Sequence, residues 1–243
     1  SVDGNGRSEQ PATKMVEEIR AAGGSALPSF DSVADFNGAE QVVRTAIDGF
    51  GRIDVLCHAA GILRDRMVFN MTEEEWDSVL KVHLFGAFNV VRNAVPHMIE
   101  QRYGRVVLFS SISALGAAGQ ANYAAAKEGI VGFSRALAQE LNPYGITVNA
   151  VYPGGNTRMM ATVSNTGRPV ASGGATHVGA DALLSSPEPI EAQTPESNAA
   201  KIVYLCTDSA ESITGQVIAT NGWSMGIYSP RHVIRSIHKD GPW

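Results

Sequence analysis

The chain has 243 residues, which suits one α/β domain, and 44% of its residues are apolar, which is enough for a sizeable core. Its net charge is −5 and its basic residues are scattered, which argues against a nucleic-acid partner or an anionic membrane surface. Cys57 and Cys206 are its two cysteines and both lie in apolar runs. We therefore expect buried free thiols and a cytoplasmic protein rather than a disulfide framework. No apolar stretch is long enough to span a membrane.

Helix-like and strand-like patterns alternate along the chain. Residues 1–11 are polar and rich in glycine, which is typical of a loop. Thr72 and Glu75 have the spacing of a capping box that opens a long helix, and we expect this helix to bend or divide near Gly86. The predicted elements are helix 12–22, strand 25–30, helix 35–50, strand 53–57, helix 72–102, strand 105–110, helix 122–141, strand 146–152, helix 196–207 and strand 215–219.

No strand-like segment precedes the first predicted helix. A doubly wound dinucleotide-binding fold begins with a strand, a glycine-rich turn at a helix N-terminus and a second strand that ends in an acidic residue. Residues 1–11 contain none of these features. We therefore expect that roughly one strand–helix–strand unit, about 30–40 residues, is absent from this sequence. A short protein without a cofactor site is the alternative.

Alternating strands and helices predict a doubly wound parallel sheet with helices on both faces, in one domain that spans residues 1–243. Ligands of such sheets bind at the carboxyl ends of the strands. The candidate residues at those ends are Asp31, Ser111, Pro153, Gly154 and the run 58–61. Residues 159–195 are rich in small and polar residues and too long for a plain connection, so we expect a lid over the substrate, with a tolerated insertion as the alternative.

Tyr123 and Lys127 form the most informative pair in the sequence. Their spacing of four residues places both side chains on one face of the predicted helix 122–141. A free tyrosine is a poor base at pH 7, because its pKa is about 10, and a neighbouring ammonium group is expected to lower that value. A hydroxyl group of Ser111, at the end of the preceding strand, could hold a carbonyl oxygen against the tyrosine proton, with Ser110 and Ser113 as rivals.

Together with the turn at Pro153, this arrangement resembles the short-chain dehydrogenase/reductase superfamily, and the resemblance implies a Rossmann-like fold. It implies that Tyr123 is the general acid/base, that Lys127 lowers its pKa and binds ribose hydroxyls, and that Ser111 orients the carbonyl. His83 stands where most of the family has an asparagine that supports a proton relay, so we expect a supporting role there or a buried structural histidine. The cofactor contacts that the resemblance implies are Asp31, Ser32, Ala59, Ala60, Gly61, Val82, Tyr123, Lys127, Pro153, Gly154 and Thr157.

Two of these assignments leave alternatives open. Asp31 is expected either to contact the adenine ring or to cap a helix N-terminus. His58 stands at a family asparagine position and is expected to be a structural residue at the end of a strand. The histidines and cysteines show no metal-ligand spacing.

Four stretches of the sequence look most like the (3R)-hydroxyacyl-CoA dehydrogenase domain of multifunctional β-oxidation enzymes and its bacterial relatives. They are residues 61–66, 82–84 and 119–127 and the tail from Asn221. The resemblance implies an NAD-dependent oxidoreductase, with NADP not excluded, that interconverts a secondary alcohol and a ketone in an acyl thioester. It also implies a homodimer or homotetramer through helices 72–102 and 122–141. A steroid or other carbonyl reductase and a non-catalytic binding or scaffold protein are the alternatives.

Overall fold

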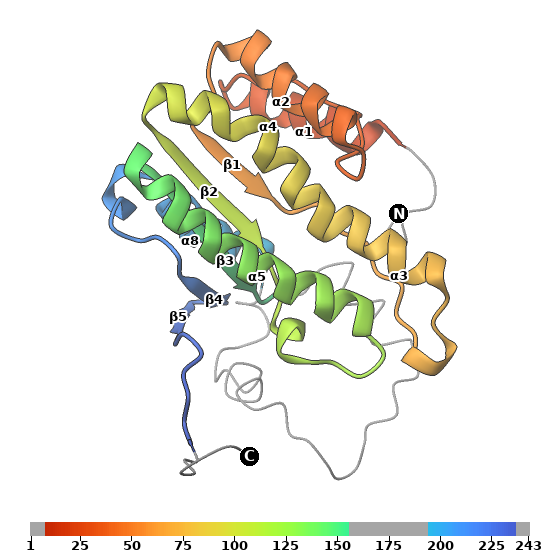
Figure 1. Ribbon diagram of the computed structural model, residues 1–243. Helices are drawn as coiled ribbons and strands as arrows, with labels where there is room; N and C mark the ends of the chain where they lie inside the picture. Colours follow the sequence, from red (N-terminus) through yellow and green to blue (C-terminus); the bar gives the residue numbers. More distant parts are fainter. Residues whose placement is uncertain (1–7, 156–193, 237–243) are drawn as a thin grey trace.

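Five strands form one sheet at the centre of the computed structural model, which describes residues 8–155 and 194–236 (Figure 1). The strands lie in the order β1-β2-β3-β4-β5, and the first four are parallel to one another, whereas β5 runs antiparallel to β4. Their bounds are Val55–His58, Gly104–Phe109, Ile146–Pro153, Val217–Asn221 and Ser224–Tyr228. The first four strands therefore end at one edge of the sheet, as predicted.

Helices cover both faces of this sheet. On one face lie α4 and α5, α2 packs against α4, and α8 lies behind the sheet (Figure 1). The bounds are Gln10–Ala21 for α1, Phe36–Phe50 for α2, Glu73–Leu80 for α3, Gly86–Gln101 for α4, Ala121–Leu141 for α5 and Pro195–Leu205 for α8. The predicted doubly wound architecture is confirmed, and the elements that form have bounds within two residues of those predicted.

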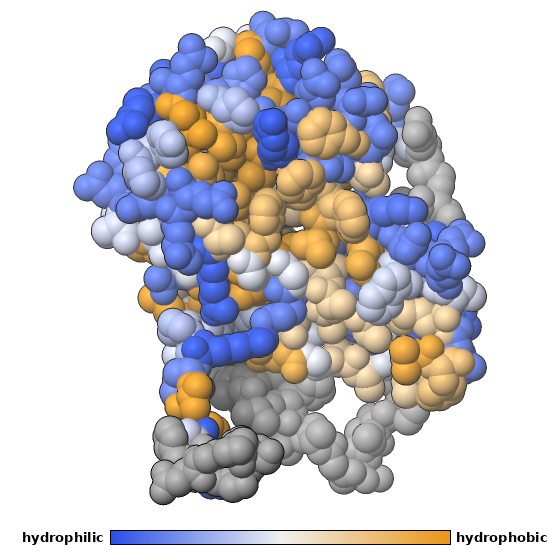
Figure 2. Space-filling model, in the orientation of Figure 1, coloured by the Kyte–Doolittle hydropathy of each residue, from blue (hydrophilic) through white to orange (hydrophobic). Residues whose placement is uncertain are grey.

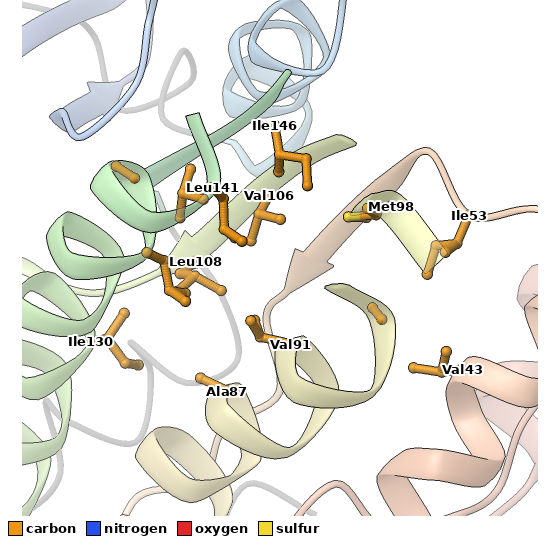
Figure 3. Close-up of a cluster of buried hydrophobic side chains, with 14 residues drawn as sticks. Val43, Ile53, Ala87, Val91, Met98, Val106, Leu108, Ile130, Leu141 and Ile146 are labelled. Atoms are coloured by element: carbon orange, nitrogen blue, oxygen red, sulfur yellow. The ribbon is translucent and has the colours of Figure 1, made fainter. Parts of the chain in front are cut away.

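Alternate residues of β2 explain why both faces are covered. Val106 and Leu108 point into a cluster with α2, α4 and α5, which Figure 3 shows, whereas Val107 packs with α8 on the other face. A strand whose successive side chains are all apolar is stable only when both faces of the sheet are buried. Each fully buried aliphatic side chain contributes about 1.5–3 kcal/mol to folding, so β2 fixes the positions of the helices on either side of it.

The segment between α3 and α4 differs from a simple bend. Thr72 and Glu75 form the predicted capping box at the start of α3. Residues Lys81–Phe85 then form a π-helical turn before α4 begins at Gly86. Such turns widen a helix locally and are frequent at functional sites. Here the turn carries His83, whose side chain is buried.

Strand 25–30 was predicted but does not form. Among the described residues, no strand lies beside this segment or on the side of β1 that faces away from β2, and an extended segment becomes a strand only when a neighbour supplies hydrogen bonds. The same open edge leaves Val55 39% exposed and Cys57 exposed, and Cys206 is half-buried. The expectation that both thiols are buried is therefore wrong.

Strand β5 was not predicted. It follows β4 through a two-residue loop, Gly222 and Trp223, in which Gly222 has a φ of 47°. Glycine is favoured at the first loop position of such hairpins, because this conformation is strained for other residues.

None of the helices in residues 8–155 and 194–236 is long and apolar enough to cross a bilayer.

Candidate active site

Tyr123 and Lys127 lie in the first two turns of α5, beside the carboxyl end of β2. Both side chains are buried, with 8% and 4% of their surface exposed. The Lys127 ammonium group donates a hydrogen bond of 2.5 Å to the Phe109 carbonyl oxygen, and its Nζ lies 5.5 Å from the centroid of the Tyr123 ring. The end of β2 therefore holds the lysine against the tyrosine, as their spacing predicts.

The hydroxyl groups of Ser110 and Ser111 have different partners. Ser110 is buried, and its hydroxyl group donates a 2.6 Å hydrogen bond to the backbone carbonyl of Lys127. Ser111 accepts a hydrogen bond of 3.1 Å from the Ser113 backbone N–H, and its side chain also interacts with the Tyr123 phenol and draws the pKa of that phenol downwards. Because Ser111 is the serine that contacts Tyr123, the geometry favours it over Ser110 as the group that orients a carbonyl oxygen.

Burial, rather than the neighbouring lysine, dominates the pKa of Tyr123. Removal of the phenol from water raises this pKa above its usual value, and the carboxylate of Asp65 raises it further, against the opposing effect of Ser111. The same burial lowers the pKa of Lys127 to about 7. The expectation of a lowered pKa at Tyr123 is therefore reversed in this structure, since the ammonium group faces the ring and the Phe109 carbonyl.

His83 packs directly against Tyr123. The two rings meet edge to face, with centroids 5.0 Å apart. Its Nε2 lies 2.8 Å from the Ile62 carbonyl oxygen and 3.1 Å from the Ile62 backbone nitrogen, so either neutral tautomer finds a partner in the same residue. Burial, aided by the charge of Lys127, lowers the pKa of His83 to about 3. The ring is neutral at pH 7, and its Nδ1 is buried with no hydrogen-bond partner.

Glycine is required at position 61 because the His83 ring packs against its backbone. A Cβ atom on residue 61 would overlap the His83 ring. The small residue was predicted to let a cofactor approach the backbone, and the structure adds a second reason for it within the protein itself.

His58 ends β1 beside the same cluster. It is buried, its pKa is lowered to about 4 by burial and by the charge of Lys127, and the backbone of His83 and Val82 opposes this shift. Its Nε2 has no hydrogen-bond partner. His58 thus joins the end of β1 to the π-helical turn, which fits the predicted structural role. A buried, unpartnered ring nitrogen also offers a hydrogen bond to a ligand at this edge.

The predicted adenine contacts lie on an exposed segment. Asp31 and Ser32 are both exposed, and Asp31 accepts a hydrogen bond of 3.1 Å from the Ser29 hydroxyl. The residue that caps α2 is Asp35, whose carboxylate accepts from the Gly38 N–H at 2.8 Å. The alternative in which Asp31 caps this helix is therefore wrong.

The turn after β3 is held by a residue that the sequence did not single out. Pro153 ends the strand, and the Gly154 carbonyl accepts a hydrogen bond from the side chain of Asn198 in α8. Asn198 looks like an ordinary polar helix residue in the sequence, so nothing there marks it. Thr157 and residues 159–193 of the expected lid lie outside the described residues. Within the described ranges, no group of three His, Cys, Asp or Glu side chains could hold a metal ion.

Comparisons with known proteins agree on one family. The family model described as short chain dehydrogenase matches residues 2–168. A putative short-chain type dehydrogenase/reductase of Mycobacterium tuberculosis is 42% identical over 207 residues, which cover 85% of this chain and 65% of the relative. The peroxisomal multifunctional enzyme type 2 of Mus musculus is 40% identical over 222 residues, 90% of this chain and 27% of the enzyme. A 3-oxoacyl-[acyl-carrier-protein] reductase of Staphylococcus aureus is 36% identical over 224 residues, 88% of this chain and 83% of the reductase.

A solved structure shows the same fold. A crystal structure of a short chain dehydrogenase from Mycobacterium avium matches with a TM-score of 0.79 and 32% identity, over 95% of this chain and 73% of that one. The chain thus spans 65% of the Mycobacterium tuberculosis relative and 27% of the peroxisomal enzyme. It spans 83% of the Staphylococcus aureus reductase and 73% of the Mycobacterium avium protein.

Proposed function

This chain belongs to the short chain dehydrogenase family, and on that basis we propose that it is an NAD(P)-dependent oxidoreductase that interconverts a 3-hydroxyacyl and a 3-ketoacyl thioester. The acyl thioester is favoured because two similar proteins are named as a peroxisomal multifunctional enzyme and an oxoacyl-carrier-protein reductase. The observation that carries the proposal is the contact of Ser111 with the Tyr123 phenol, above the buried ammonium group of Lys127.

These residues can move a proton at the reacting oxygen. In reduction, Ser111 would hold the ketone oxygen and Tyr123 would donate its phenolic proton to that oxygen as hydride adds to the carbon. In oxidation, the same phenol would accept the proton of the alcohol. Since burial raises the pKa of Tyr123, the phenol is protonated at pH 7. In this state the phenol can donate its proton directly, so reduction requires no prior deprotonation of Tyr123. Oxidation requires that the phenol first lose its proton.

The cluster also fits the ribose of a nicotinamide cofactor. Such a cofactor supplies or accepts the hydride when bound. Two hydrogen-bonding groups at this end of the sheet are available for sugar hydroxyls, namely the Lys127 ammonium group and the unpartnered Nε2 of His58. Small side chains at Ala59 and Ala60 leave the backbone at the end of β1 accessible.

The remaining assignments extend this site. In the proposal Asp31 and Ser32 contact the adenosine end, Gly61 and Val82 line the ribose, and the turn at Pro153 and Gly154, with Thr157, contacts the nicotinamide amide. His83 would relay protons, because either tautomer of its ring is bound by Ile62. NAD is the preferred cofactor in this proposal.

Assembly and location complete the proposal. We expect a homodimer or homotetramer through the helical segment 72–102 and α5, because Phe85 and Phe88 in that segment are 53% and 45% exposed, and Figure 2 shows apolar surface over this face. A cytoplasmic location is consistent with Cys57 and Cys206, whose thiols lie within hydrogen-bond distance at 3.9 Å and form no disulfide.

The test is an assay of the full-length protein with NAD or NADP and a 3-hydroxyacyl-CoA, followed by the absorbance of the reduced nicotinamide. Turnover of the thioester, with little for a steroid alcohol or a simple secondary alcohol, supports the proposal. Turnover of the steroid alone would assign a different carbonyl substrate. Failure to bind either dinucleotide in calorimetry would indicate a non-catalytic protein.

A further inference from the structure

Asn122 ties the start of α5 to two other segments of the chain. Its side chain is fully buried. The amide nitrogen donates hydrogen bonds to the Arg64 carbonyl oxygen at 3.0 Å and to the Glu75 carbonyl oxygen at 2.8 Å. The amide oxygen accepts a hydrogen bond of 2.8 Å from the backbone N–H of Tyr123. Both ends of this one side chain are therefore satisfied, each by main-chain groups.

The bond to Tyr123 replaces a missing helix cap. The first N–H groups of a helix have no partner inside the helix, and Gln120, at the N-cap position of α5, makes no side-chain cap bond. Asn122 supplies an acceptor for one of these groups, the N–H of the residue that carries the phenol. A change at Asn122 therefore acts directly on the backbone of Tyr123.

The segments that Asn122 binds are the same ones that surround the Tyr123 ring. Ile62 and Leu63, next to Arg64, pack with Val79 of α3 and with Tyr123 in one apolar cluster. A further hydrogen bond of 2.8 Å joins Gln120 to Asp65 in the same loop. The polar contacts of Asn122 and this apolar cluster thus fix the phenol relative to the loop 62–66 and α3.

From this geometry we infer that Asn122 is a positioning residue for the proton transfer at Tyr123, an inference that rests on the proposed function. Catalysis requires the phenolic oxygen to lie within hydrogen-bond reach of the reacting oxygen, and a displacement of about 1 Å can reduce turnover about 100-fold. Asn122 touches neither substrate nor cofactor in this assignment and acts through Tyr123 alone.

The test is a double-mutant cycle of Asn122→Ala with Tyr123→Phe in the full-length protein. We expect Asn122→Ala to lower kcat about 10-fold or more and to change the KM for NAD by less than about twofold. In the Tyr123→Phe background the same change should lower kcat no further, because no phenol remains to be positioned. Equal proportional losses in both backgrounds, or an unchanged kcat, would overturn the inference.

Gln101→Ala is the matched control. Gln101 is also an amide that joins distant segments, since it binds both the N–H and the carbonyl of Ile53, at 3.1 and 2.8 Å, at the opposite end of the sheet. It should lower the melting temperature without lowering kcat. If Asn122→Ala does not fold, Asn122→Ser replaces it, because its uncharged hydroxyl group keeps one polar atom in the buried site and a single O–H donor cannot make both donated bonds.

A titration of ¹³C-labelled tyrosine by NMR separates this inference from the proposed function, because it needs no substrate. The resonance of Tyr123 is assigned by its loss in Tyr123→Phe. With Asn122→Ala, the phenol should become more exposed and titrate at a lower pH than in the unmodified protein, since burial is what raises its pKa. An unchanged titration would refute positioning by Asn122 even if the protein had no dehydrogenase activity. A changed titration in a protein without activity would refute the proposed function alone.

Discussion

The two ends of the parallel strands bury titratable groups in different ways. At the amino end, the guanidinium group of Arg105 is buried and donates to the carbonyl oxygens of Gly104 at 2.9 Å, Gly145 at 3.2 Å and Thr207 at 3.3 Å. Its charge lies 4.4 Å from the centroid of the Tyr103 ring. These polar groups are held by other parts of the protein, which is the usual arrangement for a stable interior.

The carboxyl end holds groups that the protein leaves without partners. His58 and His83 each bury an unpartnered ring nitrogen, and burial moves the pKa values of Lys127 and Tyr123 in directions that disfavour their charged forms. Leaving a buried polar atom unpaired costs about 1–3 kcal/mol. Clusters of perturbed groups of this kind are typical of functional sites. The contrast favours the carboxyl end as the place of the proposed chemistry and the amino end as structural support.

The largest expected effect is a difference in kcat between substitutions of two tyrosines, Tyr123 near the carboxyl end of β2 and Tyr103 at its amino end. Tyr123→Phe should lower kcat about 10³-fold, because it removes the proton donor. Tyr103→Phe removes a hydroxyl group that donates to Asp208 at 2.9 Å at the amino end, and kcat should stay within about twofold while stability changes by about 1 kcal/mol. Steady-state kinetics and thermal melts of both variants check this. Similar losses of kcat in the two would remove the distinction between the ends.

The adjacent serines give the next largest effect. Ser111→Ala should lower kcat about 10–100-fold with little loss of stability, since Ser111 contacts the phenol. Ser110→Ala leaves the buried carbonyl of Lys127 without its 2.6 Å donor, so it should destabilise the fold by about 1–3 kcal/mol and lower kcat less. Kinetics and urea unfolding of both variants measure this. A greater loss of kcat for Ser110→Ala than for Ser111→Ala would mean that Ser110, and not Ser111, orients the carbonyl oxygen.

Gly61 tests how tightly the cluster is packed. Gly61→Ala should cost about 1–3 kcal/mol, because its Cβ would overlap the His83 ring. The control is Gly226→Ala in β5, where a Cβ meets no atom within 4 Å, and it should stabilise the strand by about 0.5–1 kcal/mol. Denaturant unfolding of the two variants compares them. Equal stabilities would show that the ring of His83 can move aside freely.

The last prediction concerns the dependence of stability on pH. The pKa of His83 is about 3 in the folded protein and 6.5 when unfolded. Between these values His83 binds one more proton in the unfolded chain than in the fold, so its contribution to the free energy of unfolding rises with pH by about 1.4 kcal/mol per unit and is lost as pH falls from about 6.5 towards 3. His83→Asn should flatten the slope of melting temperature against pH between 4 and 6. An unaltered slope would mean that His83 takes up a proton in the fold.

The sequence predicted the architecture well because its signals are local. Continuous apolar runs such as residues 105–109 and the four-residue spacing of Tyr123 and Lys127 depend only on strand and helix periodicity. The helices and four of the strands formed where these patterns placed them, and Tyr123, Lys127, Ser111 and His83 lie together. Their catalytic and cofactor-binding roles remain predictions.

The rest depended on contacts between distant segments. Residues 25–30 have a strand-like sequence but no strand beside them among the described residues, and Asn122 acquires its role only when Arg64 and Glu75 reach it. The direction of the pKa shift at Tyr123 was predicted wrongly for the same reason. A neighbouring lysine is visible in the sequence, whereas the extent of burial is a property of the assembled fold.

Hydride transfer is tested most directly with a substrate that carries deuterium at C3. The full-length protein is incubated with NAD and a 3-hydroxyacyl-CoA deuterated at that carbon, and the reduced nicotinamide is analysed by mass spectrometry. We expect the reduced cofactor to carry the deuterium, at a rate about 10³-fold lower in Tyr123→Phe. Reduced cofactor without deuterium, or equal transfer by Tyr123→Phe, would contradict a dehydrogenase site at the carboxyl end of the sheet.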